Sequence, residues 1–505
     1  MITPLNSLKI CPCFCGGPPL WICEDGRSST LEVEAPKSLN FPRLDFPHRW
    51  TEKTSHCSWH QCFEQPYPPC DSRSMNILST LMISNYPEAQ PRSVAFEIWV
   101  NGEKVDALRA EKADFALFEC AGPVDILVVT AVDASGTLVK PLSRHITPLI
   151  DNGAIRFKID GPQFLCLDVP GLKPFFIYAN PPEVEKPAPD APDVRYYAAG
   201  RIYEAGEITL LSGETLYIEA GAVVRGNVRC ANASGVSIRG RGVLDGSFYD
   251  FAKGKRMLSI AFDQCTHVHV ADIVMIEPTG WMLVLGGCNH VHVEGLKQIG
   301  SVMSSDGIDV CGSKNVLIEN CCLRNDDDNI AIKAFSPWSD DVENVHVRNC
   351  IFLNGEPGNV MEIGYELRAG RVTNVVFEDI DVLYAHGGGA VFSIHNGDRA
   401  IVDNIRWENI RVEHYWDKLI DFRVVFSRYN TDLERGSIRN VQLKNIRVFN
   451  ASVNPGHSVS LISGFNSDKP ARNVTLQDFY LNDKKALQAD DLDLYVRNAE
   501  EIRFL

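Results

Sequence analysis

The sequence predicts an all-β protein in which a small β-sandwich precedes a right-handed parallel β-helix. Three observations predict this class. Short strands rich in β-branched residues recur along the second part of the chain at intervals of 23 to 36 residues. Turn residues separate these strands, and no helical periodicity runs through them. Upstream, alternating apolar and polar runs end in hairpin signals, as is typical of a sandwich.

The sandwich is expected over residues 76–180. Residues 93–100 alternate between apolar and polar side chains and end at Asn101 and Gly102, a pair that favours a tight hairpin turn. Residues 181–193 then contain five prolines, which favour a stiff and extended linker. The β-helix is therefore expected to occupy residues 194–505.

The repeats themselves indicate the β-helix. A repeat made only of short strands cannot bury its apolar face alone, so it must stack on its neighbours. Leucine-rich repeats would show a leucine ladder and propeller blades would be longer, so one β-helix coil per repeat fits best. Many repeats start with an asparagine: Asn315, Asn344, Asn374, Asn404, Asn440 and Asn473. These asparagines are expected at turns, where their side chains can bond the backbone or stack as a ladder.

The first 75 residues are expected to form a poorly ordered extension. They carry seven of the 16 cysteines and many prolines. The stretch from His56 to Cys62 contains two histidines and two cysteines, so a zinc site is the alternative, although the spacing matches no familiar finger. The segment lacks the basic and apolar regions of a signal peptide, which leaves the compartment open. The other nine cysteines are expected to be buried free thiols.

Composition excludes two classes of partner. The chain of 505 residues has 49 basic and 65 acidic residues, a net charge of −16. Such a surface repels phosphate backbones, so nucleic acid is not expected as a partner. No run approaches the roughly 18 apolar residues that a membrane helix needs, so no membrane contact is expected either.

Carboxylates gather at the start of two consecutive coils. Residues 304–309 read Ser-Ser-Asp-Gly-Ile-Asp, and residues 325–333 read Asn-Asp-Asp-Asp-Asn-Ile-Ala-Ile-Lys. Stacked coils would place Asp306 beside Asp327 and Asp328, so that repulsion raises the pKa of one carboxyl while its neighbours stay ionised. Such divergence suits general acid–base hydrolysis, and the rung spacing is compatible with the separation of about 6.5–9.5 Å found in inverting glycosidases. A calcium site and a plain polar turn are the alternatives.

Four motifs then appear in a recognisable order. Residues 240–246 form a glycine-rich turn, and a proline–tryptophan coil follows at residues 278–281 and 288–291. Residues 304–309 match Asn-Thr-Asp-Gly-x-Asp, and residues 327–332 match Asp-Asp-x-x-Ala-Ile. Over residues 194–480 this order resembles the polygalacturonase clan, which comprises glycoside hydrolase family 28 and the related family 49 of dextranases and isopullulanases. The preceding sandwich points toward family 49.

The resemblance implies a pectin-lyase-like β-helix that hydrolyses glycosidic bonds with inversion. By position, Asp327 would be the general acid, and Asp306 and Asp328 would activate the attacking water. No cofactor and no metal are expected, the protein is expected to be a monomer, and its expected partner is a polysaccharide or oligosaccharide. Members of the clan are usually exported.

Two departures from family 28 bear on the substrate. Asn359 stands in place of the histidine of Gly-His-Gly, and residues 393–395 read Ser-Ile-His where the family has an Arg-Ile-Lys that grips the uronate. Losing both cations removes charge-assisted hydrogen bonds that favour an acidic sugar, so a neutral glycan is expected. The residues expected to bind substrate are Asn359, Glu362, Tyr365, His395, Lys333 and Asp309.

Three other functions stay open. The first is a polygalacturonase acting on pectin. The second is a non-catalytic glycan-binding β-helix, which the presence of all three acids argues against. The third is a lyase or epimerase, which would need a basic residue or calcium to remove a carbon-bound proton and which the motif set disfavours. Aromatic residues expected near the groove, where they could stack on sugars or fill the core, are Trp281, Trp338, Tyr365, Tyr384, Phe392 and Trp416.

Overall fold

The computed structural model describes residues 81–449 and 459–505. The extension expected over residues 1–75, with its histidine and cysteine stretch, lies outside the described residues. Within them the regular elements are strands and four short 3-10 helices, η2 (Leu142–Arg144), η3 (Gly246–Phe248), η4 (Phe251–Lys253) and η5 (Ala489–Leu492). No helix of the described part is long and apolar enough to cross a membrane. The all-β prediction is confirmed.

Two sheets form the predicted sandwich. One contains β1 (Leu81–Met82), β4 (Ala107–Arg109), β5 (Asp114–Cys120), β7 (Leu138–Lys140), β10 (Gln163–Asp168) and β11 (Phe175–Asn180). The other contains β2 (Phe96–Val100), β3 (Glu103–Val105), β6 (Val124–Thr130), β8 (Leu149–Asp151) and β9 (Ala154–Ile159). The alternating run becomes β2, which buries Phe96, Ile98 and Val100. Asn101 and Gly102 take positive φ angles of 49° and 83° and turn the chain back into β3.

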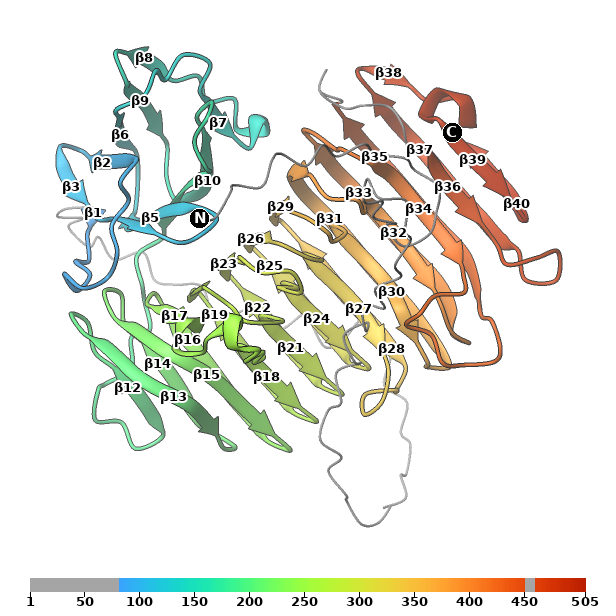
Figure 1. Ribbon diagram of the computed structural model, residues 1–505, viewed down its shortest axis with the longest axis horizontal. Coiled ribbons are helices and arrows are strands. Elements are labelled where there is room, and N and C mark those ends of the chain that lie inside the picture. The colour runs from blue at the N-terminus through green and yellow to red at the C-terminus, as the bar shows by residue number, and fades with distance from the viewer. Residues whose placement is uncertain (1–80, 450–458) are drawn as a thin grey trace, which may run out of the picture. The chain divides into compact units, whose positions relative to one another are not determined.

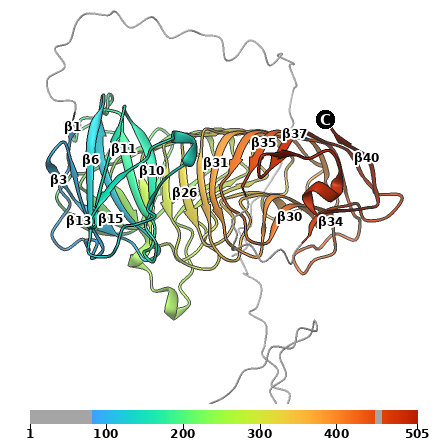
Figure 2. The same ribbon diagram turned by 90° about the horizontal axis from the view of Figure 1, so that it is seen from above.

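From residue 194 the chain winds into a right-handed parallel β-helix whose rungs follow one another in sequence order (Figures 1 and 2). We name its three faces by what they carry. The ladder face consists of β12 (Val194–Tyr197), β14 (Thr215–Ile218), β16 (Ser234–Gly240), β19 (Thr266–Ala271), β22 (Asn289–Glu294), β25 (Lys314–Glu319), β28 (Val342–Arg348), β31 (Arg371–Ala385), β33 (Ile401–Val412), β35 (Ser437–Val448), β37 (Ala471–Leu481) and β40 (Ala499–Phe504), with β38 (Lys484–Lys485) antiparallel to β37.

The other two faces position the site. The interface face consists of β13 (Ile202–Leu210), β17 (Val243–Asp245), β20 (Val274–Ile276), β23 (Lys297–Ile299), β26 (Cys322–Asn325) and β29 (Ile351–Asn354), and residues 223–225 and 381–385 of two longer strands pair with it. The acidic face consists of β15 (Val223–Ala231), β18 (Ile260–Asp263), β21 (Leu283–Gly286), β24 (Ile308–Cys311), β27 (Ile330–Ala334), β30 (Met361–Leu367), β32 (Ala390–Asn396), β34 (Lys418–Val424), β36 (Ser460–Ser463) and β39 (Leu494–Arg497).

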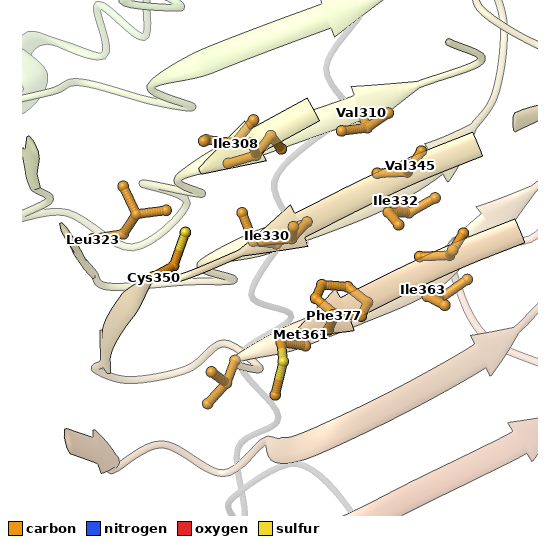
Figure 3. Packing of buried hydrophobic residues seen from close by; sticks show 14 of the residues in the cluster. Ile308, Val310, Leu323, Ile330, Ile332, Val345, Cys350, Met361, Ile363 and Phe377 are labelled. Atoms are coloured by element: carbon orange, nitrogen blue, oxygen red, sulfur yellow. The ribbon is translucent and has the colours of Figure 1, made fainter. Parts of the chain in front are cut away.

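Stacked aliphatic side chains fill the β-helix. Ile308, Ile330 and Met361 occupy the same register position of β24, β27 and β30 and lie fully buried (Figure 3). Because side chains alternate along a strand, the next residues, including Asp309 and Glu362, point to the opposite side. The buried stack therefore fixes which polar groups the acidic face presents. The nine cysteines of the described part are all buried and free, as predicted.

The recurrent asparagines form the predicted ladder. Asn315, Asn344, Asn374 and Asn404 have positive φ angles of 56–61°, a conformation in which asparagine is favoured over most residues. Each donates a side-chain hydrogen bond of 2.7–3.0 Å to the asparagine of the preceding rung, beginning at Asn289. These asparagines therefore form the turns and also stack as a ladder.

The sandwich and the β-helix share a buried interface. Apolar side chains of the sandwich pack on those of the interface face: Leu108, Phe115, Leu117, Phe176 and Tyr178 against Val243, Val274, Ile299, Cys322 and Ile351. Arg241 of the β-helix pairs with Glu119 of the sandwich at 2.7 Å, and both side chains are nearly buried. The sandwich is thus held beside the rungs that carry the carboxylates.

Candidate active site

Two turns on adjacent rungs bring the predicted carboxylates together. Asp306 precedes β24, while Asp327 and Asp328 precede β27. The amide of Gly307 donates to the carbonyl of Asp328 at 2.7 Å, which continues the parallel register into the turns. One carboxylate oxygen of each aspartate lies within 4.8 Å of the other two. The grouping expected from the spacing of the motifs is present.

The closeness of these oxygens differs from the expected separation. Inverting glycosidases usually hold their two carboxyl groups about 6.5–9.5 Å apart. Here the nearest oxygens are no more than 4.8 Å apart. The physical reason is that Asp327 and Asp328 are consecutive residues and Asp306 lies on the neighbouring rung, where strands are only about 4.8 Å apart.

Lys333 supplies the positive charge of the cluster. Its Nζ donates to Asp306 at 2.7 Å and to Asp309 at 2.8 Å, and it lies 4.0 Å from the ring centroid of Trp281. The lysine and both aspartates are buried. Lys333 thus joins Asp309 to Asp306 of the acid cluster. Hydrogen bonds of this kind are needed to offset the cost of burying an ion pair.

Burial and mutual repulsion shift the acids unequally. Desolvation, followed by the charges of Asp306 and Asp328, raises the pKa of Asp327 to about 9. Desolvation and the charges of Asp306 and Glu362 raise the pKa of Asp328 to about 7. Burial also raises the pKa of Asp309 well above its usual range, against the opposing effect of Lys333. Asp327 therefore carries a proton at neutral pH.

Asn359 holds Asp328 in place. Its backbone amide and its side-chain Nδ2 both donate to Oδ1 of Asp328, at 2.7 and 3.0 Å. Its own Oδ1 accepts from the amide of Ala390 at 2.9 Å. An asparagine whose side chain is held at both its Nδ2 and its Oδ1 can orient a carboxylate, and Asn359 is 8% exposed. The residue that replaces the family histidine is thus a neutral donor to one of the acids.

A second charged group follows on the next rungs of the acidic face. Nδ1 of His395 lies 2.9 Å from Glu362, and its Nε2 lies 3.2 Å from Asp421. Burial lowers the pKa of His395, but the charges of Glu362 and Asp421 outweigh this effect and raise it to about 9. Arg423 donates to Asp421 at 2.7 Å. Two cations and two carboxylates are therefore paired with each other here.

Sequence reasoning missed Asp421 and Arg423. They lie in β34 at the positions paired with Ser393 and His395 of β32. The signal was present, because β34 alternates charged residues with the apolar Ile420 and Phe422 in the middle of the repeat region. Arg423 thus adds a guanidinium one rung after His395.

Aromatic side chains flank the charged groups. Tyr365 stacks on His395 with ring centroids 4.3 Å apart, and it also contacts Tyr429 at 5.5 Å. Tyr429 and Phe426 are exposed, at 42% and 70%. Two of the aromatics expected near the groove, Phe392 and Trp338, are instead buried side chains that pack against other aromatic rings: Trp407 and Phe479 for Phe392, and Phe335 for Trp338. The same alternation that points Glu362 away from the apolar stack turns Phe392 into it.

A cavity of about 620 Å³ is lined by residues of the sandwich and by Asp326, the residue that precedes Asp327. Lys112 of the sandwich lines it together with Arg324, Asp326, Tyr384 and His386 of the β-helix. Lys112 lies 3.6 Å and Arg324 2.8 Å from Asp326, the residue that precedes Asp327. The cavity combines aromatic rings with charged groups, as saccharide sites do.

Comparison of the sequence with known protein families gives one match. The sequence profile of the glycosyl hydrolases family 28 matches residues 207–488, more than half of the chain. The chain belongs to this family. The match spans the Asp cluster, Lys333, the His395 group and most of the β-helix, and it leaves out the sandwich.

Curated relatives and a solved structure are also similar to the chain. A probable exopolygalacturonase C of Aspergillus terreus is 32% identical over 143 residues, which cover 26% of this chain and 31% of the relative. Its counterpart in Aspergillus flavus is 26% identical over 237 residues, which cover 41% and 52%. The chain thus spans a third to a half of these relatives. Dex49A from Penicillium minioluteum superposes with a TM-score of 0.65 at 13% identity, covering 84% of this chain and 96% of Dex49A, a likeness of fold alone.

Proposed function

We propose that the protein is an inverting glycoside hydrolase in which Asp327 is the general acid and Asp306 and Asp328 are the base. One observation carries the proposal: a partly buried carboxyl whose pKa is about 9 lies within 4.8 Å of two other carboxyls. A proton held at neutral pH is what a general acid donates to the leaving glycosidic oxygen. Family membership supports glycosidic bonds as the target.

The neighbouring contacts support a division of labour. Asp306 accepts a hydrogen bond from Lys333, and Asp328 accepts two from Asn359. These donors orient the two carboxylates, one of which takes the proton of the attacking water while Asp327 protonates the departing sugar. Lys333 also offsets negative charge in the buried cluster, so that the base can remain ionised beside a protonated acid.

The prediction of inversion rests on the family resemblance, and the anomeric configuration of the product tests it. The nearest oxygens lie closer together than in most inverting enzymes, so the spacing does not by itself decide the stereochemical outcome. Proton NMR of the first product formed should show the anomer opposite to that of the substrate. A product that retains the anomeric configuration at early times would assign one of the aspartates as a nucleophile.

We propose a neutral glycan as the substrate. His395 pairs with Glu362 and Arg423 pairs with Asp421, so both cations already have a carboxylate partner that offsets the charge a uronate would require. Neutral sugars need only hydrogen bonds and aromatic faces, which Tyr365 and the exposed Tyr429 and Phe426 supply.

Polygalacturonate is the second candidate, and two observations favour it. The curated relatives are named as exopolygalacturonases, and Arg423 brings a cation onto the acidic face that the motif comparison did not anticipate. Release of reducing sugar from dextran, pullulan, galactan and polygalacturonate decides between the candidates. Activity confined to polygalacturonate would overturn the neutral assignment.

The variant Asp327→Asn tests the acid assignment. Loss of the donated proton should lower kcat by at least about 100-fold, because general acid catalysis contributes about 10²–10⁴-fold. Asp340→Asn is the matched control, since Asp340 is exposed and close in sequence. An Asp327→Asn enzyme with unchanged turnover would remove Asp327 from the mechanism. Formation of an unsaturated product, detected by ultraviolet absorbance, would identify a lyase instead.

A further inference from the structure

Two histidines and a glutamate meet on the ladder face, a different face of the β-helix from the one that carries the carboxylate cluster. His269 of β19 and His292 of β22 are register partners on adjacent rungs. Their rings stack with centroids 5.3 Å apart and an interplanar angle of 16°. Glu294 follows His292 by two residues, so its side chain projects from the same side of the strand. Parallel register thus places three metal-ligating side chains together.

The ligand atoms converge around Glu294. One ring nitrogen of each histidine and a carboxylate oxygen of Glu294 all lie within 4.8 Å of one another. Oε1 of Glu294 is 2.8 Å from Nε2 of His269, and its Oε2 is 4.0 Å from Nε2 of His292. One carboxylate therefore faces both rings, with a separate oxygen toward each.

The surroundings leave the cluster reachable. The side chains of His269 and His292 are 36% and 37% exposed. His269 and Glu294 also line a cavity of about 570 Å³ together with Arg239, Arg241 and Glu185. The cluster is thus recessed and open to solvent, in contrast to the buried acids of the candidate active site. A further carboxylate, Glu319, lies 2.8 Å from Nε2 of His292, but it also pairs with Arg348 at 2.7 Å.

We propose that His269, His292 and Glu294 bind a divalent transition-metal ion such as Zn²⁺. Two imidazole nitrogens and one carboxylate oxygen suit zinc and its neighbours, and they suit calcium and magnesium poorly. Water or Glu319 completes the coordination. Small side-chain rotations bring the ligand atoms to the metal–ligand distances of about 2.0–2.2 Å.

Such an ion links two rungs of the stack. An ion that binds only the folded chain raises the free energy of unfolding. The proposed site is separate from the hydrolytic machinery, so its presence or absence does not depend on the substrate or on the roles of the aspartates. Glycan hydrolysis should proceed with or without the metal.

Calorimetric titration of the EDTA-treated full-length protein with ZnCl₂ tests the proposal. The variants His269→Ala and His292→Ala should each weaken or abolish one binding event by at least about tenfold in Kd, a change of about 1.4 kcal/mol. Zinc should raise the midpoint of thermal unfolding of the wild type more than that of either variant. CaCl₂ should produce neither effect.

His346→Ala is the matched control. His346 lies on the same face and pairs with Glu378 at 2.9 Å, but its register neighbours are Leu317 and Val376, so it lacks a second histidine. This variant should bind zinc as the wild type does. Zinc held by the cysteines and histidines of residues 1–75 would survive all three substitutions. An identical titration for the wild type and for a variant lacking both His269 and His292 would overturn the proposal.

Discussion

The raised pKa of Asp327, which suits its proposed role as an acid, lowers the stability of the folded protein at neutral and alkaline pH. Its carboxyl is surrounded by acidic neighbours in a buried turn, and its pKa is raised to about 9. In the unfolded chain the pKa of aspartate is about 3.9. Between these values the folded state holds one more proton than the unfolded state, so the stability contributed by this group is lost as the pH rises from about 4 to about 9.

Asparagine at position 327 removes this pH dependence. Asp327→Asn should exceed the wild type in free energy of unfolding at pH 8 by about 1 kcal/mol or more, since one unit of pKa shift corresponds to about 1.4 kcal/mol. The difference in free energy of unfolding should shrink toward pH 4, where residue 327 is uncharged in both folded proteins. Denaturant unfolding at several pH values measures it, and Asp340→Asn should show no such trend. A variant that is less stable than the wild type at pH 8 would contradict the raised pKa.

The same group is expected to set the alkaline limit of activity. If Asp327 is the acid and Asp328 assists the base, kcat/KM should fall as the pH rises above about 9, because Asp327 then loses its proton, and as the pH falls below about 7, because Asp328 then gains one. Measurements below, within and above this range on the best substrate of the panel provide the test. Full activity well above pH 9 would exclude an acid with this pKa.

At the scale of the element, the asparagine ladder holds successive turns together. Asn344 donates to Asn315 and accepts from Asn374, each at 3.0 Å, and its φ angle is 61°. A substitution there affects two separate contributions: the amide hydrogen bonds, and the cost of a left-handed backbone conformation. Glycine lacks the second cost, whereas alanine incurs it.

Two variants of Asn344 separate these contributions. Asn344→Ala should lower the free energy of unfolding by about 3–4 kcal/mol, from two lost hydrogen bonds of about 1 kcal/mol each and a left-handed penalty of about 1–2 kcal/mol. Asn344→Gly should lower it by less, because glycine adopts positive φ readily. Chemical unfolding of both proteins provides the measurement. Equal losses would show that the backbone conformation contributes nothing at this turn.

At the scale of the whole molecule, the sandwich completes a cavity beside the carboxylates. Lys112 reaches it from the sandwich and lies 3.6 Å from Asp326 of the β-helix. The family match does not include the sandwich, so this cavity is a feature of the combined chain. A glycan that extends from the acids toward the sandwich would contact Lys112 and the rings of Tyr384 and His386.

Substitution of Lys112 tests whether the sandwich contributes to glycan binding. Lys112→Ala should raise KM for a polymeric substrate by about three- to tenfold with kcat unchanged. The reason is that the variant removes a contact that stabilises the bound substrate and the transition state equally. A short oligosaccharide that does not reach the cavity should be unaffected. Lys104→Ala is the control, since Lys104 is an exposed sandwich lysine paired with Glu97. Equal KM values on the polymer would exclude Lys112 from the binding surface.

Much of the fold could be predicted because a β-helix repeats the same local rules. The spacing of strands such as residues 344–347 and 374–377, and the asparagines that begin them, predicted both the coil and the turn conformation. The grouping of Asp306 with Asp327 and Asp328 followed as well, since a parallel register brings equivalent positions of neighbouring coils together.

The sequence by itself therefore determined the fold class, the ladder and the carboxylate cluster, because each depends on position within a repeat. Only the tertiary structure decided the pairing of His395 with Asp421 and Arg423, the role of Asn359 as a donor to Asp328, and the cavity that Lys112 lines. These features depend on loop lengths between rungs, on which side of a strand faces outward, and on where a separate sandwich packs. The relative positions of these groups are set by the packing of the whole chain, and no local sequence pattern encodes them.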